Sequence, residues 1–203
     1  MSLSASSETA PSAADKQRRR GRRIALVILA FCAAPTVAAW LAYFVWQPQS
    51  RTNYGDLIEP RSLSDPELRR FDGSSFRFSQ LRGKWVLLQV DSAACSDRCR
   101  KKLVYMRQAR LALGKDADRI ERVWLVDGAG VPDPVLLRED GGLKVVRAQG
   151  RSLLEELPSS GNPAGYIFVV DPLGSLMLRF PGDPDAPKMV KDLARLLKVS
   201  RIG

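Results

Sequence analysis

The sequence predicts a mixed α/β domain preceded by one transmembrane helix. Three observations support this prediction: an uncharged run over residues 24–46, apolar runs of strand length at 85–90 and 122–126 with a helical pattern between them, and a hairpin pattern at 166–180. Strands that alternate with helices indicate a sheet covered on both faces. The 203 residues, 45% hydrophobic and 27% charged, suit one globular domain plus an anchor.

The uncharged run is the first element. Its 23 residues suffice to span a bilayer core of about 30 Å. A cleaved signal peptide is the alternative, but its apolar region covers only about 7 to 15 residues, whereas this run is longer and ends in aromatic residues that suit a membrane interface. Six cations at residues 16–23 precede the run. The positive-inside rule then holds the N-terminus in the cytoplasm.

Composition divides the chain into four expected parts. These are a disordered basic cytoplasmic tail (1–23), the transmembrane helix (24–46), a linker (47–67) and a domain (68–203). In a bacterial inner membrane this domain lies in the periplasm, where disulfides persist. The net charge is +10 overall but +6 after residue 46. A basic cluster beside a membrane helix indicates orientation, so no nucleic acid is expected as a partner.

Within the domain, local patterns predict the remaining elements. Asp72-Gly73 predicts the turn of a short hairpin, and Gly114 ends a helix predicted at 95–113. Further elements are expected as strands at 145–146, 166–171 and 176–180, a short helix at 152–157 and an amphipathic helix at 186–199.

Two cysteines, Cys95 and Cys99, lie where the strand at 85–90 gives way to the helix. The partial positive charge of a helix N-terminus and the neighbouring cations favour thiolate, which indicates redox or soft-metal chemistry. The chain contains no histidine. This excludes a Ser-His-Asp triad, a Cys-His nucleophile pair and histidine-based zinc or haem sites. No glycine motif for nucleotide phosphates occurs.

Several segments together carry a resemblance to a known family. They are Leu-Arg-Gly-Lys-Trp at 81–85, the CxxxC spacing of Cys95 and Cys99, and Tyr-Ile-Phe-Val-Val-Asp-Pro-Leu-Gly at 166–174. The pattern resembles the Sco/SenC family of membrane-anchored thioredoxin-fold proteins. Residues 53–57 and 90–92 further resemble a group of Sco-like transmembrane proteins of proteobacteria. The resemblance implies a thioredoxin-like fold over about residues 68–199 and a role in cytochrome c oxidase assembly, with oxidase subunits or copper chaperones as partners.

The sequence also departs from that family. Sco proteins bind copper through the two cysteines and a histidine before the penultimate strand, where this chain has Asn-Pro-Ala-Gly at 162–165. Copper(II) favours imidazole, so the family's site is not expected intact, but two thiolates alone hold copper(I). Met106 is then either a third sulfur ligand or a core residue.

Three interpretations of the cysteine pair stay open. In the first, which we favour, the protein is a thiol-disulfide oxidoreductase in which Cys95 attacks and Cys99 resolves a mixed disulfide. In the second, both thiolates hold copper(I), the one cofactor expected here. In the third, the pair is a structural disulfide in a non-enzymatic assembly scaffold.

Neighbouring residues each have a structural and a functional interpretation. Asp91 either accepts a proton from a thiol or caps a turn, and Pro163 is either a cis proline beside the cysteines or an ordinary turn residue. The pair Lys101-Lys102 is expected on a solvated helix face, where it could meet an acidic partner. Core packing is expected for the strand residues Trp85 and Trp124. Cys32 is expected to be a small packing residue of the membrane helix that cannot reach the other two cysteines.

Overall fold

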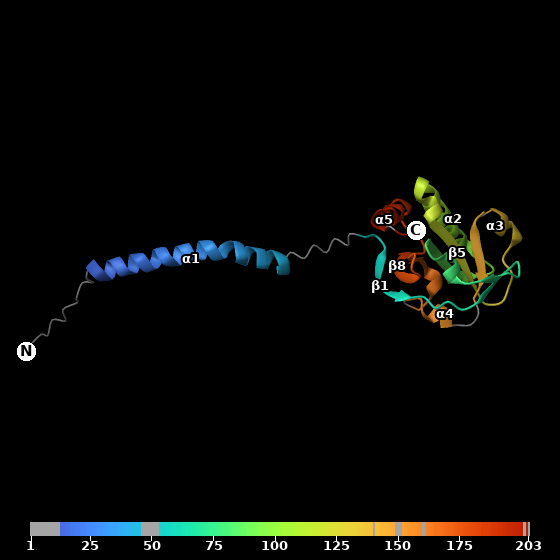
Figure 1. The fold of residues 1–203 in the computed structure, drawn as a ribbon, viewed down its shortest axis with the longest axis horizontal. Helices are drawn as coiled ribbons and strands as arrows, with labels where there is room; N and C mark the ends of the chain where they lie inside the picture. The colour runs from blue at the N-terminus through green and yellow to red at the C-terminus, as the bar shows by residue number, and fades with distance from the viewer. Residues whose placement is uncertain are drawn as a thin grey trace, which may run out of the picture. The chain divides into compact units, whose positions relative to one another are not determined.

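The structure, a computed structural model, describes residues 13–45, 53–139, 141–148, 152–159, 161–200 and 202. The chain forms two compact units, Met1–Arg51 and Thr52–Gly203. The described part of the first unit is one helix, α1 (Ala13–Val45), which contains Pro35 (Figure 1). Its segment Arg20–Ala42 is long and apolar enough to be a candidate membrane span. Trp46, the end of the predicted span, lies outside the described residues.

The predicted disordered tail needs a correction from residue 13 onward. Residues 13–23 are helical and continue directly into the apolar segment of α1. Ala, Lys, Gln and Arg are strong helix formers, and extending an existing helix avoids the cost of nucleation. Residues 1–12 lie outside the described part of the chain.

The second unit is built around a mixed sheet whose described strands follow the order β1-β8-β7-β4-β5-β6-β2-β3. The strands are β1 (Asp56–Ser62), β2 (Leu68–Arg70), β3 (Ser75–Phe76), β4 (Trp85–Ser92), β5 (Ile120–Asp127), β6 (Leu143–Arg147), β7 (Tyr166–Val170) and β8 (Ser175–Pro181). The central strands β4, β5 and β6 are parallel, and β7 runs antiparallel to β4. The predicted mixed α/β class is confirmed.

The linker predicted at residues 47–67 is too long. Strand β1 lies inside that range and pairs antiparallel with β8, with Leu57 opposite Leu178. Pro60 is tolerated because β1 is an edge strand, where one side of the backbone needs no ladder partner. The sheet therefore begins at Asp56, twelve residues earlier than the predicted domain boundary at residue 68.

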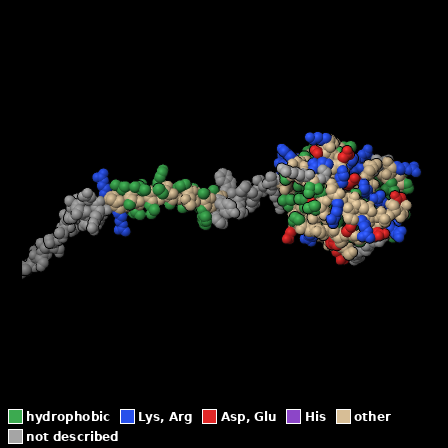
Figure 2. Space-filling view, in the orientation of Figure 1, with side chains coloured by type: hydrophobic (Ala, Val, Ile, Leu, Met, Phe, Trp, Pro, Cys, Tyr) green, Lys and Arg blue, Asp and Glu red, His purple; other side chains and the backbone are tan. Residues whose placement is uncertain are grey.

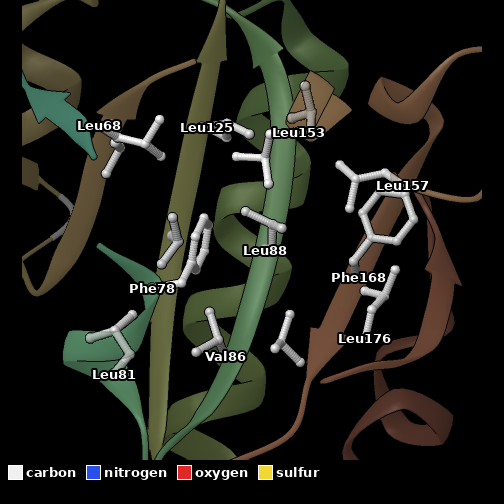
Figure 3. Packing of buried hydrophobic residues seen from close by; sticks show 14 of the residues in the cluster. Leu68, Phe78, Leu81, Val86, Leu88, Leu125, Leu153, Leu157, Phe168 and Leu176 are labelled. Carbon is white, nitrogen blue, oxygen red and sulfur yellow. The ribbon is translucent and has the colours of Figure 1, made fainter. Parts of the chain in front are cut away.

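Alternation along the strands sends side chains to two core layers. Trp85 and Leu87 of β4 pack with α2 (Asp97–Ala112) and α5 (Ala186–Val199), the two long helices on one face. Figure 3 shows the opposite layer, where Val86 and Leu88 lie near Phe168. That layer is covered by the short helices η1 (Phe78–Leu81) and α4 (Ser152–Glu155). Each fully buried aliphatic side chain stabilises the fold by about 1.5–3 kcal/mol.

A third buried cluster lies toward the carboxyl ends of β4 and β5. It contains Trp124 and Val126 of β5 together with Leu103, Cys95 and Cys99. Trp85 and Trp124 are both buried, so their predicted core packing is confirmed. The remaining elements are η2 (Gly114–Arg119), α3 (Pro134–Glu139) and η3 (Pro163–Gly165).

Candidate functional site

The cysteine segment is a tight turn between β4 and α2. Cys95 precedes the helix, which begins at Asp97 rather than at residue 95 as predicted, with Ser96 as the N-cap. The backbone N–H of Cys95 donates to the carbonyl of Ser92 at 3.1 Å. Closing this turn places Cys95 in the left-handed region, at φ +41°. A left-handed conformation at a residue with a side chain costs about 1–3 kcal/mol, so the turn holds backbone strain.

The structure brings the two cysteines together as a disulfide. The sulfur atoms of Cys95 and Cys99 are 1.99 Å apart and their Cα atoms 5.0 Å apart. Both residues are buried, Cys95 being 2% exposed and Cys99 fully covered. An attacking thiolate from another protein therefore reaches the pair only when the turn before α2 opens.

Gln89 is a polar residue in an otherwise apolar stretch of β4, and it faces the disulfide. Its side-chain amide donates to the sulfur of Cys99 at 3.7 Å. Gln89 is fully buried, and its carbonyl Oε1 has no hydrogen-bond partner among the described residues. An unsatisfied buried acceptor costs about 1–3 kcal/mol. The oxidised pair thus leaves a polar group beside it without a partner.

A buried ion pair lies one helical turn beyond Cys99. The ammonium group of Lys102 is 3.0 Å from a carboxylate oxygen of Asp91, which follows the buried run of β4. It also donates to the carbonyl oxygens of Val90 at 3.0 Å and Ala164 at 2.7 Å. Burial lowers the pKa of Lys102 below its ordinary value, and Asp91 opposes this shift. Lys102 thereby ties α2 to the end of β4 and to the loop before β7.

The predicted solvated face of α2 is correct for Lys101 and wrong for Lys102. Lys101 is exposed, whereas the Lys102 side chain is completely buried. The available signal was helical spacing: Cys99, Lys102, Met106 and Ala109 recur at three- and four-residue intervals on the buried side of α2. A lysine on an otherwise apolar stripe indicates a buried cation with a partner.

Asp91 and Pro163 both have structural roles. Besides the ion pair, Asp91 accepts the backbone N–H of Ser92 at 3.0 Å. Pro163 begins η3, whose cap is Asn162 through a 2.9 Å bond from the N–H of Ala164. No peptide bond in the described ranges is cis. The predicted ordinary-turn interpretation of Pro163 therefore fits the geometry.

An open hollow lies beside this loop. It is lined by Arg98, Lys101, Gly165, Gly182 and Asp183. Arg100 lies on the same turn of α2 and donates to the carbonyl oxygen of Cys95 at 3.3 Å. The surface next to the disulfide is therefore rich in cations, as the sequence predicts.

Sequence reasoning missed a contact between the turn that carries Cys95 and the loop after β5. Gly130, in the loop after β5, passes so close to Ala93 that an added Cβ would lie 2.9 Å from the Ala93 Cβ. Its φ of +141° also favours glycine. Arg147 donates to the Gly130 carbonyl at 3.0 Å, which anchors the loop.

The structure limits the ligands available to a metal. Met106 is fully buried among Trp85, Leu87 and α5 residues, in a different cluster from the cysteines. Met106 follows Cys99 by seven positions of the helix, about 10 Å along the axis. No group of three or more His, Cys, Asp and Glu residues in the described part of the chain could hold a metal ion. The two thiolates of the reduced pair are the donors that fit copper(I), which accepts soft ligands in low number.

Cys32 takes no part in this site. It lies in α1, within the first unit, and carries an exposed free thiol.

Comparisons with known proteins bear on the fold. The family described as "Transmembrane-like, thioredoxin-like, C-terminal domain" matches residues 85–200. No curated protein matches the chain. The chain is similar to yeast Sco1 with copper bound, at a TM-score of 0.58 and 14% identity, covering 70% of this chain and 96% of that one.

Two further solved structures share the fold. The thioredoxin domain of a thiol-disulfide oxidoreductase from Bacteroides vulgatus has a TM-score of 0.55 and 20% identity, over 70% of this chain and 99% of that one. BsSco is a member of the Sco family of cytochrome c oxidase assembly proteins, and a disulfide switch was identified in it. It has a TM-score of 0.54 and 13% identity, over 71% of this chain and 98% of that one. The predicted thioredoxin-like fold and its resemblance to Sco proteins are confirmed at the level of structure.

Proposed function

Because the chain belongs to the family of transmembrane-like proteins with a thioredoxin-like C-terminal domain, we propose that it is a membrane-anchored factor for cytochrome c oxidase assembly that acts by thiol–disulfide exchange at Cys95 and Cys99. The anchor is α1, with its basic end in the cytoplasm of a bacterium and the thioredoxin-like domain in the periplasm. The partners are an oxidase subunit or a copper chaperone whose cysteines must be reduced before they bind copper.

The observation that carries this proposal is the bonded cysteine pair at the junction of β4 and α2. Only Cys95 lies in the strained turn ahead of the helix, and the cations Arg98, Arg100 and Lys101 surround that end of α2. Positive charge at a helix N-terminus stabilises thiolate. These features favour Cys95 as the attacking sulfur and Cys99 as the resolving one.

The exchange balances as a two-electron transfer. The Cys95 thiolate attacks one sulfur of a partner disulfide, and a mixed disulfide forms as the other partner sulfur leaves as thiolate. Cys99, as thiolate, then attacks Cys95, which releases the second partner sulfur. The partner gains two thiols and this protein gains the disulfide seen in the structure. A periplasmic dithiol donor must reduce the pair for another cycle.

Strain in the turn makes this chemistry compatible with burial. Cys95 leaves its left-handed conformation when the turn before α2 opens, which returns part of the strain energy. The side chain of Ser96 makes no capping bond to α2 that would oppose this opening.

Copper(I) holding by the same two thiolates is the second candidate function. It is favoured by the structural likeness to yeast Sco1, which was solved with copper bound. Without a histidine anywhere in the sequence, the site would supply two sulfur ligands, which suits copper(I) and disfavours copper(II).

The experiment is performed on the full-length chain in its membrane. A Cys99→Ser variant should trap its partner as a mixed disulfide on Cys95, detectable on a non-reducing gel. A double Cys95→Ser, Cys99→Ser variant should abolish the assembly of active oxidase, and Cys32→Ser should leave it intact. If active oxidase assembles normally while the double variant is present at wild-type abundance, the protein acts only as a scaffold.

The cationic surface beside the site supplies a second test. Reversing charge at Arg98 and Lys101 should weaken capture of an acidic partner while leaving the disulfide intact, because both side chains are exposed at the rim of the hollow. Reversal at Lys115, an exposed cation in η2, is the matched control.

A further inference from the structure

A second surface of the domain, separate from the cysteines, is apolar and exposed. Leu57, Leu173, Val199 and Ile202 are each more than half exposed, with Val199 at 83%. Two hollows lie among these residues, and both are lined by Leu196 and Val199, so the hollows adjoin. Figure 2 shows hydrophobic side chains gathered on the surface over β1 and β8. We call Leu57, Leu173, Leu196, Val199 and Ile202 the apolar patch. Contiguous exposed apolar surface of this kind marks an interaction site.

Cations border the apolar patch along α5. Lys191, Arg195 and Lys198 recur at four- and three-residue spacing, so they form one exposed stripe next to Leu196 and Val199. Arg195 lies 4.0 Å from the buried carboxylate of Asp192, which offsets part of its charge.

Another cation borders the apolar patch at the turn that joins β7 and β8. The N–H of Gly83 donates to the Pro172 carbonyl at 2.9 Å, which places the exposed Arg82 beside this contact. The ammonium group of Lys84 is turned to the carbonyl of Asp118 at 2.7 Å. Asp171 also lines the hollow there, but its carboxylate is occupied by the N–H groups of Leu173 and Ser175. An apolar surface rimmed by Lys and Arg has the chemistry of a protein segment that lies at a membrane interface.

Chain length keeps this surface close to the candidate anchor. Asn53, which lines one of the two hollows, follows Val45, the last residue of α1, by eight positions. Eight residues span at most about 28 Å when fully extended. An anchored chain therefore cannot carry Asn53 farther than that from the end of α1.

We propose that the apolar patch and its cationic rim dock on the anionic lipid surface of the same bilayer that holds α1. This inference rests on the proposed anchor. Leucine, valine and isoleucine side chains enter the boundary between headgroups and acyl chains, while the Lys and Arg groups contact lipid phosphates. The occupant is lipid because the chain tethers this surface to the bilayer and because its rim carries a positive excess.

Docking in this way also sets the direction in which the cysteines face. Trp85, which lines one hollow, begins β4, and Cys95 follows the other end of that strand. Eight strand residues cover about 26 Å. The docked domain therefore presents its cysteine pair away from the bilayer, where the water-exposed domains of membrane-bound partners lie.

The test uses the full-length chain, carrying Cys32→Ser, in nanodiscs that contain phosphatidylglycerol. A nitroxide is attached after a Val199→Cys substitution, and its collision with oxygen and with a water-soluble nickel complex is measured by electron paramagnetic resonance. The Cys95–Cys99 disulfide stays unlabelled. Val131→Cys is the matched control, because Val131 is 71% exposed and follows the opposite end of the parallel strands.

The expected result is preferential oxygen contact at position 199 and preferential nickel contact at position 131. Replacing Lys191, Arg195 and Lys198 together by Gln should lower the ratio of docked to undocked domain roughly a hundredfold, about fivefold for each cation. Neutral phosphatidylcholine discs should weaken docking in the same way.

Three results would overturn the proposal, and they differ from one another. Nickel contact at position 199, in a chain that resists carbonate extraction from cell membranes, means that the anchor is right and the docking wrong. Loss of the chain to the supernatant when the cell membranes are extracted with carbonate means that the anchor itself is wrong. Spin–spin broadening at position 199 means that the apolar patch joins two copies of the chain.

Discussion

The ammonium group of Lys102 and the carboxylate of Asp91 form an ion pair of 3.0 Å at the point where the helix that carries Cys99 crosses the end of β4. The same ammonium group holds the loop before β7 through the carbonyl of Ala164. A buried lysine from α2 thus fixes the loop before β7.

Breaking this pair on one side should be strongly destabilising. We predict that Asp91→Leu and Lys102→Met each lower the free energy of unfolding by about 3–5 kcal/mol, because each leaves a buried charge without its partner. The double variant Asp91→Leu, Lys102→Met should recover much of this loss. Lys101→Met, at the exposed neighbour, should change stability by less than about 0.5 kcal/mol. Urea denaturation measures the free energy of unfolding of all four variants. A loss in the double variant equal to the sum of the two single losses would mean that Asp91 and Lys102 do not stabilise each other.

The buried lysine should also give stability a dependence on alkaline pH. Burial holds the pKa of folded Lys102 below the ordinary value of 10.5, so the unfolded chain binds more protons between these two values. The contribution of Lys102 to stability therefore rises with pH through that window and levels off above 10.5. We predict that wild type gains stability relative to Lys102→Met as the pH is raised through this window. If the free energies of unfolding of wild type and Lys102→Met change with pH in parallel, Lys102 is not the source of this dependence.

The contact between Gly130 and Ala93 should be sensitive to a single methyl group. We predict that Gly130→Ala destabilises the domain by about 1–3 kcal/mol, since its Cβ would lie 2.9 Å from that of Ala93 and its φ is +141°. Gly128→Ala is the control: it has positive φ but no atom within 4 Å of an added Cβ. Adding Ala93→Gly to the Gly130 variant should restore part of the loss, and thermal unfolding of the oxidised chain reports it. Equal costs at the two glycines would mean that the contact carries no energy.

Gln89 should tune the redox equilibrium of the pair. In the oxidised state its Nε2 donates to the disulfide sulfur of Cys99 at 3.7 Å, and a reduced Cys99 thiolate accepts the same bond more strongly because it is charged. Gln89 therefore favours the reduced state by about one hydrogen bond, or roughly 1 kcal/mol. We predict that Gln89→Leu makes the midpoint potential about 20 mV more negative. A shift to more positive values in a glutathione titration would contradict this role.

The sequence was sufficient to predict the elements whose hydrophobic pattern is local. Strands β4, β5, β7 and β8 and helix α5 were all expected near their observed bounds, because continuous or periodic apolar residues mark them. The cysteine pair was identifiable as a candidate site from its place between a strand and a helix.

The features that sequence reasoning missed depend on contacts distant in the chain. Strand β1 carries Pro60 and few apolar residues, and only its pairing with β8 makes it a strand. The partner of Lys102 in the loop before β7 is 62 residues away, and Gly130 meets Ala93 through the packing of two loops. Tertiary packing rather than local propensity fixes each of these.

The measurement that tests the central claim most directly is the midpoint potential of the Cys95–Cys99 pair in the purified full-length chain, with a copper(I) competition titration on the same reduced sample. A thiol–disulfide exchange function predicts a potential between roughly −120 and −270 mV together with weak copper binding. A potential below about −300 mV without copper binding would make the pair a structural disulfide in a scaffold. Tight capture of copper(I) by the reduced pair would contradict the exchange mechanism and establish a copper-carrying role instead.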